Sequence, residues 1–205
     1  MVPQSVTYRR RHFAALLVAL AIAVPASAKD AKSTSGAAAT AAPAVQIDNF
    51  GRINEHYYRG ALPHETDYAA LARLGVKTMI DLTDVDGDSS EQRLAETAGM
   101  KFFKLAMNTR VVPTAGQIAT FLSIVDDPAN QPVYVHCVGG RHRTGVMTAI
   151  YRMLEDKWTP DQAFKEMKSY KFGADFLHPE FKKFVLAFNP ALAAASILPA
   201  PPVDK

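Results

Sequence analysis

The chain is poor in cysteine, and this excludes several classes of protein. Only one cysteine, Cys137, occurs among the 205 residues, so no internal disulfide can form. No group of cysteine and histidine has the spacing of a zinc site, and the sequence therefore predicts neither a metal ion nor a cofactor. The domain must rely on its hydrophobic core, which a chain of about 160 residues is long enough to build.

The chain also lacks an excess of one charge and a long apolar run. It has 23 Lys and Arg residues against 20 Asp and Glu. Residues 1–28 hold three arginines and no acidic residue, so 20 residues of each sign remain beyond them. A neutral domain has no general attraction for nucleic acid, and any anion site must be local. The apolar run over residues 13–24 is too short for a bilayer, which needs about 20 residues.

The first 28 residues have the pattern of a secretory signal peptide. Arg9–Arg11 form a basic start, the apolar run follows, and Ala26-Ser27-Ala28 is an A-x-A cleavage site. The arginines fit a twin-arginine signal only weakly. We therefore expect an exported protein, periplasmic or secreted, with no stable membrane insertion after cleavage. Residues 29–46 are rich in alanine with Ser, Thr, Gly and Pro, which predicts a disordered linker.

The single cysteine lies in a segment with the pattern of a phosphate-binding loop. Residues 136–145 read H-C-V-G-G-R-H-R-T-G, so that five residues separate Cys137 from Arg143 and Thr144. The residues before the cysteine predict a short buried strand, and those after Thr144 predict a helix. Backbone N–H groups of such a loop and of a helix N-terminus converge on one point and favour an anion there.

Each polar residue of this loop has a use in phosphate-ester chemistry. The thiolate of Cys137 is a nucleophile, and its pKa, about 8.5 in a free cysteine, falls near a helix N-terminus and near cations. The neighbouring cations are Arg141, His142 and Arg143. Arg143 can bind two phosphate oxygens at once and stabilise the phosphoryl group in transfer. Thr144 can donate its hydroxyl to the sulfur and make it a better leaving group.

The other loop positions contribute backbone groups or support. Two adjacent glycines allow the loop to curl its amides toward a ligand, and His136 is expected to support the loop through a backbone hydrogen bond. An inert buried cysteine is the ordinary interpretation of a lone cysteine, but it does not account for the glycine pair, the arginine and the Thr-Gly together. The predicted phosphate-binding residues are Val138, Gly139, Gly140, Arg141, His142 and Arg143.

At these residues the chain resembles the cysteine-based protein tyrosine phosphatase superfamily, and within it the compact dual-specificity branch. Tyr58–Pro63 looks like the YRSGQP segment of bacterial and fungal members, and Gly75–Leu82 looks like their GVKTIIDLR strand. The loop is similar to the CxxGKHRTG loop of fungal and plant atypical members, some of which cleave inositol pyrophosphates. The resemblance implies a metal-independent, two-step hydrolysis of phosphomonoesters, in which Cys137 becomes a phosphocysteine and Arg143 binds phosphate.

One part of the family pattern is missing. Most members carry an aspartate general acid on a loop that corresponds to residues 105–113, and this segment contains no carboxylate. An earlier loop is acidic instead, with Asp84, Asp86 and Asp88. Asp84 is a candidate replacement acid, although a solvated turn is the ordinary interpretation of such a segment. A general acid contributes about 10²–10⁴-fold, so without one the substrate needs a good leaving group.

Alternating helix and strand patterns predict an α/β fold of three layers, with helices around a mostly parallel sheet of about four to five strands. One domain is expected over residues 47–188, with a flexible tail over residues 189–205. The loops near Asp84, Asn108 and Lys171 should surround Cys137 at the carboxyl edge of the sheet. The predicted strands are residues 57–60 at the sheet edge, 76–82, 101–106 and 133–135, and the predicted helices are residues 64–74, 89–98, 144–156 and those that begin at 113, 160 and 179.

Three functions compete for this pattern. The first is an exported, monomeric phosphatase of the dual-specificity type, acting on phosphotyrosine-type proteins or on polyphosphorylated small molecules. The basic pair Arg141-His142 suits the second kind of substrate. A non-catalytic phosphate-binding module would keep Arg143 and tolerate the missing acid, but it would have no need of Cys137. A rhodanese-like sulfur carrier also uses a cysteine loop after a strand, but it does not require arginine and threonine at these positions.

Overall fold

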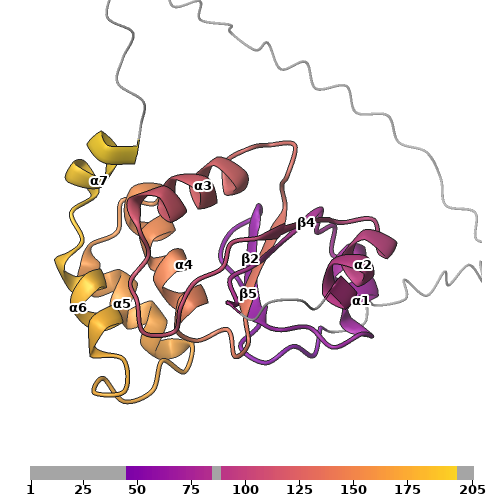
Figure 1. Ribbon diagram of the computed structural model, residues 1–205, viewed down its shortest axis with the longest axis horizontal. Helices are drawn as coiled ribbons and strands as arrows, with labels where there is room; N and C mark the ends of the chain where they lie inside the picture. Colours follow the sequence, from indigo (N-terminus) through magenta and orange to yellow (C-terminus); the bar gives the residue numbers. More distant parts are fainter. Residues whose placement is uncertain (1–44, 85–88, 198–205) are drawn as a thin grey trace, which may run out of the picture. The chain divides into compact units, whose positions relative to one another are not determined.

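A computed structural model describes residues 45–84 and 89–197 of the chain. In that part, one sheet has the strand order β1-β2-β5-β3-β4 (Figure 1). β1 pairs antiparallel with β2, and the other neighbours are parallel. The strands are β1 (Gly51–Arg52), β2 (Tyr57–Ala61), β3 (Thr78–Asp81), β4 (Lys101–Lys104) and β5 (Val133–Cys137). The predicted signal peptide and all but the last two residues of the predicted linker lie outside the described residues.

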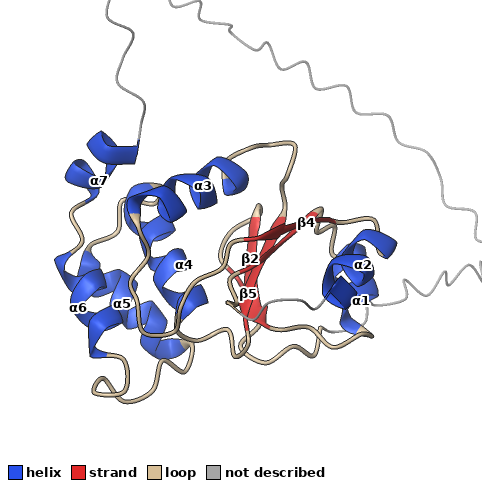
Figure 2. Ribbon diagram, in the orientation of Figure 1, coloured by secondary structure: helices blue, strands red, loops and turns tan. Residues whose placement is uncertain are grey.

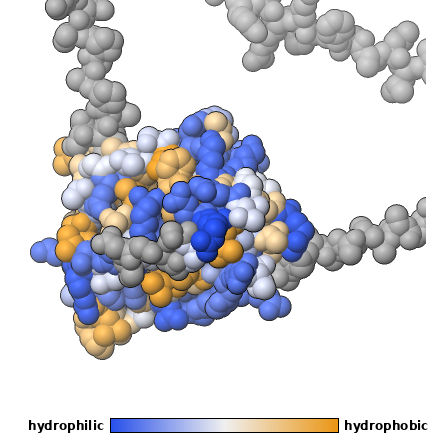
Figure 3. Space-filling model, turned by 45° about the vertical axis from the view of Figure 1, so that its right-hand side comes forward, coloured by the Kyte–Doolittle hydropathy of each residue, from blue (hydrophilic) through white to orange (hydrophobic). Residues whose placement is uncertain are grey.

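Helices cover both faces of the sheet (Figure 2). One face carries α1 (Asp67–Arg73) and α2 (Ser89–Thr97). The other face carries the larger group, α3 (Ala115–Val125), α4 (Arg143–Leu154), α5 (Pro160–Ser169) and α6 (Pro179–Ala187), and a further helix, α7 (Pro190–Ile197), packs against α3. This three-layer α/β arrangement confirms the predicted fold class. The face of the domain in Figure 3 mixes hydrophilic and hydrophobic residues.

Alternate residues of the central strand β5 belong to different cores. Val133, Val135 and Cys137 contribute to the core beneath α3–α6, whereas Tyr134 belongs to the core beneath α1 and α2. His136 stacks on the Tyr134 ring, with ring centroids 5.7 Å apart. Because side chains alternate along a strand, Cys137 and His136 point to opposite sides of the sheet.

The register of the parallel strands brings their carboxyl ends together. Ala61 of β2 is opposite Cys137, and Asp81 of β3 is opposite His136. The loops that follow β2, β3 and β5 therefore meet at one edge of the sheet, as expected for a ligand site in an open α/β sheet.

Several predicted elements differ from those of the structure, and two of the differences have a clear physical reason. β2 is not the edge strand, because the two residues of β1 pair outside it; a strand that short has no periodicity to recognise. α3 does not begin at Pro113. Its N-cap is Thr114, whose hydroxyl accepts a bond from the Gln117 N–H while the Gln117 side chain accepts one from the Thr114 N–H. This capping box fixes the start of the helix.

The first residues of the predicted tail form a helix, α7. Asn189 caps this helix by accepting bonds from the backbone N–H groups of Ala191 and Leu192. Alanine is the best helix former, and Ala193 packs against the main core. None of the helices in the described part of the chain combines the length and the hydropathy that a membrane crossing requires.

Candidate active site

The loop between β5 and α4 packs against the end of β2. Gly140 has a φ of 61°, and a Cβ atom there would lie 2.4 Å from the carbonyl carbon and oxygen of Gly60 and 2.7 Å from the nitrogen of Ala61. The Leu62 N–H donates to the Val138 carbonyl at 3.2 Å. Only glycine fits at position 140, because both its φ and the space around it exclude a side chain.

A buried arginine holds the loop from behind. Arg59 of β2 is fully buried, and its Nη2 donates to the Gly140 carbonyl at 2.5 Å. Its guanidinium lies 4.0 Å above the Tyr170 ring, a cation–π contact. Burial lowers the pKa of Arg59, but an arginine side chain keeps its proton in proteins. Arg59 was not among the predicted site residues. The signal that could have indicated its role is an arginine inside an otherwise apolar, buried strand.

The Cys137 thiol lies at the end of β5, nearly inaccessible to solvent. Burial raises the pKa of this thiol, but hydrogen bonds from the hydroxyl and the backbone N–H of Thr144 act in the opposite direction. The charge of Arg143 and the backbone N–H of Arg141 add to them, so that the pKa of Cys137 is lowered overall. The thiolate is the reactive form of cysteine, so the lowered pKa favours the nucleophilic form of Cys137.

Arg143 begins α4, and its side chain is buried beside the thiol. Its Nη1 donates to the Asp84 carboxylate at 2.7 Å and to the Met107 carbonyl at 3.1 Å. The structure thus brings Asp84, which the sequence marked as a candidate acid, to Arg143, the predicted phosphate-binding arginine. The other two acidic candidates, Asp86 and Asp88, lie outside the described residues.

The loop of residues 105–113 borders the site through its backbone. Met107 supplies the carbonyl that Arg143 binds, and Arg110 donates to the Leu177 carbonyl at 2.6 Å. Neither contact provides an acid. Asp84 is therefore the carboxylate that the described residues place on the Arg143 guanidinium.

The His142 ring is engaged away from the loop. One ring nitrogen lies 2.9 Å from the Phe172 carbonyl, and the ring centroid is 3.7 Å from that of His178. Burial lowers the pKa of His142, and the charges of His178, Arg141 and Arg143 lower it further. The hydrogen bond to Phe172 raises it, but does not reverse the direction. The prediction that His142 binds phosphate holds at most for its backbone, because its ring is committed to Phe172.

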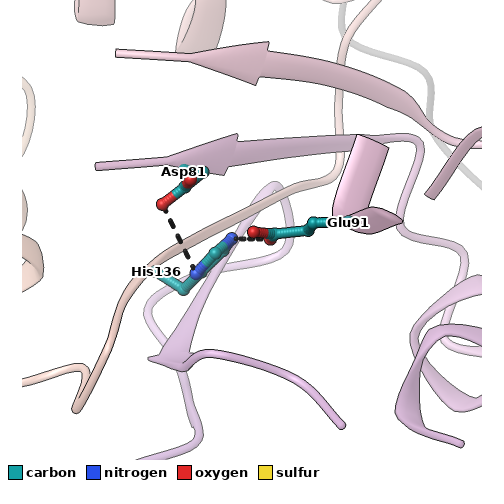
Figure 4. Close-up of side chains that lie close together, drawn as sticks. All are labelled: Asp81, Glu91 and His136. Carbon is teal, nitrogen blue, oxygen red and sulfur yellow. Dashed lines mark ion pairs between the residues drawn. The ribbon is translucent and has the colours of Figure 1, made fainter. Parts of the chain in front are cut away.

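His136 supports the loop in a way that the sequence analysis did not predict. Its ring lies between two carboxylates rather than against a backbone group (Figure 4). Nε2 is 2.7 Å from Glu91 of α2, and Nδ1 is 4.0 Å from Asp81 of β3. All three side chains are buried. The ring thus ties the residue before Cys137 to α2 and β3, while the His136 carbonyl accepts a hydrogen bond from the Leu82 N–H at 2.9 Å.

Comparison with known proteins identifies the family of this loop and fold. A family model described as "DSP-PTPase phosphatase fused to NAD+ Kinase" matches residues 45–182. The chain belongs to this family of dual-specificity phosphatases. The resemblance that the loop indicates, to the dual-specificity branch of the cysteine-based phosphatases, is thereby confirmed.

Two relatives of the chain are named as a protein phosphatase and an inositol diphosphatase. The dual specificity protein phosphatase TpbA of Pseudomonas aeruginosa is 29% identical over 160 residues, which cover 78% of this chain and 71% of that protein. The inositol diphosphatase SIW14 of Saccharomyces cerevisiae is 27% identical over 133 residues, which cover 62% of this chain and 47% of that protein. The chain thus matches about half the length of the yeast relative.

Solved structures of the same phosphatases share the fold. A crystal structure of P. aeruginosa TpbA has a TM-score of 0.63 at 25% identity, covering 74% of this chain and 91% of that one. The core catalytic domain of SIW14 from S. cerevisiae has a TM-score of 0.63 at 24% identity, covering 73% and 92%. These likenesses favour an enzyme over a non-catalytic binding module.

Within the described residues, Asp81, Glu91 and His136 form a group with the ligand types of a metal site, their atoms within 4.8 Å of one another. The two carboxylates face different nitrogens of the imidazole ring, however, and Nε2 already lies 2.7 Å from Glu91 (Figure 4). Lys104 already binds Asp81, at 2.5 Å. The group therefore fits a network of ion pairs better than a metal site.

Proposed function

We propose that the protein hydrolyses phosphate esters or phosphoanhydrides with Cys137 as the nucleophile. The observation that carries this proposal is the place of the thiol: Cys137 is buried at the end of β5, next to the start of α4, where Arg143 and Thr144 lie and lower its pKa. The sulfur attacks phosphorus, an S–P bond forms, and the bond to the leaving oxygen breaks. Water then attacks the phosphocysteine, phosphate departs, and the sulfur leaves as a thiolate. Arg143 binds two phosphate oxygens throughout, and the Thr144 hydroxyl stabilises the departing thiolate.

Asp84 is the carboxylate that we assign to proton transfer. Its ion pair with Arg143 neutralises the guanidinium while the loop holds no phosphate. A bound phosphoryl group would take the same guanidinium and so bring Asp84 next to the phosphate oxygens. The Asp84 side chain is 37% exposed, so it has contact with the solvent from which a proton must come. General acid catalysis of this kind protonates the leaving oxygen.

The substrate that we propose is a phosphorylated protein or small molecule with a good leaving group. The segment that usually carries the acid offers only a backbone carbonyl to Arg143, so protonation of the leaving oxygen depends on Asp84 alone, which favours aryl phosphates and phosphoanhydrides over alkyl phosphates. The names of the relatives, a dual specificity protein phosphatase and an inositol diphosphatase, support both kinds of substrate.

We also propose that the protein is exported and acts as a monomer outside the cytoplasm. The support is the sequence pattern of residues 1–28, with its basic start, apolar run and A-x-A site. Mass spectrometry of the protein recovered from the producing cells tests the proposal. A mature N-terminus at Lys29 supports cleavage after Ala28, and an intact Met1 in all of the protein contradicts it.

The test of the catalytic proposal is hydrolysis of p-nitrophenyl phosphate under reducing conditions with EDTA present. The protein should be active, and Cys137→Ser should reduce the rate to background while vanadate still binds. Activity that persists in Cys137→Ser would contradict the assignment of the nucleophile. Phosphate binding without turnover in either protein would favour the non-catalytic module instead.

A further inference from the structure

Two cationic side chains at the rim of the cysteine loop share one carboxylate. Arg141 belongs to the loop, and its Nη2 is 3.5 Å from Oδ2 of Asp48. Lys171 follows α5, and its Nζ donates to Oδ1 of the same carboxylate. The side chains are exposed to similar extents: Arg141 to 45%, Lys171 to 57% and Asp48 to 48%. Three segments far apart in sequence therefore place two positive charges and one negative charge beside the loop.

The segment around Asp48 is held by contacts other than its carboxylate. The backbone carbonyl of Asp48 accepts a hydrogen bond from the Ala61 N–H at 2.9 Å. The next residue, Asn49, donates from its side chain to the Gly139 carbonyl at 2.8 Å. Ion pairs between exposed side chains contribute little to stability. The segment is thus anchored to both β2 and the loop without the carboxylate, whose role must lie elsewhere.

The charges around Asp48 are those that an anionic ligand would use. The hydrogen bond from Lys171 is the first cause that lowers the pKa of Asp48, and the bond from Arg141 adds to it. Each carboxylate oxygen takes one of the two cations. A phosphate group has three free oxygens and nearly two charges, so it can bind both cations in place of the carboxylate.

We propose that Asp48 is a specificity-determining residue that occupies, as an internal anion, a subsite in which Arg141 and Lys171 bind a second phosphate group of the substrate. This inference rests on the proposed function, because it places the first phosphate in the cysteine loop. A ligand with one phosphate group leaves the ion pairs of Asp48 intact. A ligand with several phosphate groups must displace the carboxylate, and its affinity is reduced by that competition.

The experiment compares two anions in Asp48→Asn and in the native sequence. Inhibition of p-nitrophenyl phosphate hydrolysis is measured with inorganic phosphate and with inositol hexakisphosphate. Asp48→Asn should strengthen inhibition by the hexakisphosphate about three- to tenfold and change inhibition by phosphate less than twofold. The gain should shrink as salt is added, since exposed charges are screened. An unchanged or weaker inhibition by the hexakisphosphate would overturn the proposal, because Asp48 would then hold the two cations in place for the ligand.

A matched control is Asp175→Asn. Asp175 also takes two lysines, Lys168 and Lys182, each at 2.7 Å, but it lies outside the cysteine loop. Asp175→Asn should leave the ratio of the two inhibition constants unchanged. If it strengthened inhibition by the hexakisphosphate as much as Asp48→Asn does, the effect would be one of general charge, and the role proposed for Asp48 would be overturned. Calorimetry on Cys137→Ser with and without Asp48→Asn gives the same ratio without turnover, so a failure of the proposed catalysis remains distinguishable from a failure of this inference.

Discussion

The two sides of the cysteine loop differ in how they are built. The inner side is buried, and it is held by Arg59 on the Gly140 carbonyl and by the ion pair of His136 with Glu91. On the outer side, Arg141 and Lys171 are half-exposed and Arg143 is buried, and all three meet carboxylates that solvent can reach. Charged groups can be buried only with partners, because an unpaired buried charge is costly. The inner contacts are therefore permanent, whereas the outer ones can be exchanged for a phosphate.

The largest effect should come from Gly140→Ala, on the inner side. The new Cβ would lie 2.4 Å from the backbone of Gly60, so the loop must shift away from β2. Because a displacement of about 1 Å in an active site can cost roughly 10²-fold, kcat for p-nitrophenyl phosphate should fall by about that factor. Gly139→Ala is the control, since its Cβ meets only the Arg141 side chain, at 3.5 Å or more. Equal losses in both variants would show that steric contact with β2 does not shape the loop.

The next effect should come from Glu91→Gln, which removes one charge from behind the loop. Glu91 is buried 2.7 Å from His136, and taking one partner away from a buried polar group costs about 1–3 kcal/mol. The free energy of unfolding, measured with urea, should fall by a similar amount, and kcat should fall more than KM changes. Glu96→Gln, on the exposed face of the same helix, should change neither. If Glu91→Gln were as stable and active as the native protein, the contact between Glu91 and His136 would not support the loop.

A smaller effect should come from Thr144→Val, inside the loop. The Thr144 hydroxyl lowers the pKa of Cys137, so its loss should raise that pKa. The thiolate then forms at higher pH, so the rise in the rate of alkylation by iodoacetamide should occur at a higher pH than in the native protein. Turnover should slow about tenfold, as expected for one lost hydrogen bond to a charged group. Thr144→Ser keeps the hydroxyl and should keep the native alkylation profile. If the native protein and both variants had the same profile, the Thr144 hydroxyl would not be a cause of the lowered pKa of Cys137.

The smallest effect on p-nitrophenyl phosphate should come from Asp84→Asn, on the outer side. The nitrophenolate leaving group needs little protonation, so its rate should change by less than about twofold, whereas an alkyl phosphate should slow at least tenfold. Equal slowing of both substrates would indicate that Asp84 acts through Arg143 rather than on the leaving group. The comparison of leaving groups thus separates proton transfer from positioning.

The parts of the site that the sequence could predict are local in the chain. The spacing of Cys137, Arg143 and Thr144 defines one strand, loop and helix start, and the acidic loop after β3 was visible as a cluster. Alternation along β5 also predicts the side to which His136 points, because the residue before an inward cysteine faces the opposite layer.

The parts that the sequence could not predict depend on contacts between distant segments. Arg59 and Gly140 are 81 residues apart, and Arg141 and Asp48 are 93 apart. No periodicity relates such residues, so their contacts appear only once the sheet order is known. The contact of the His142 ring with the Phe172 carbonyl could not be predicted for the same reason, because Phe172 lies on a separate segment after α5.

The most direct test of the account is to trap the covalent intermediate. The protein is mixed with excess p-nitrophenyl phosphate, quenched with acid within the first turnovers, digested and analysed by mass spectrometry. The account predicts one added phosphoryl group on the peptide that contains Cys137, and none in Cys137→Ser. A phosphoryl group on another residue, or active protein that never carries one, would contradict the thiolate mechanism.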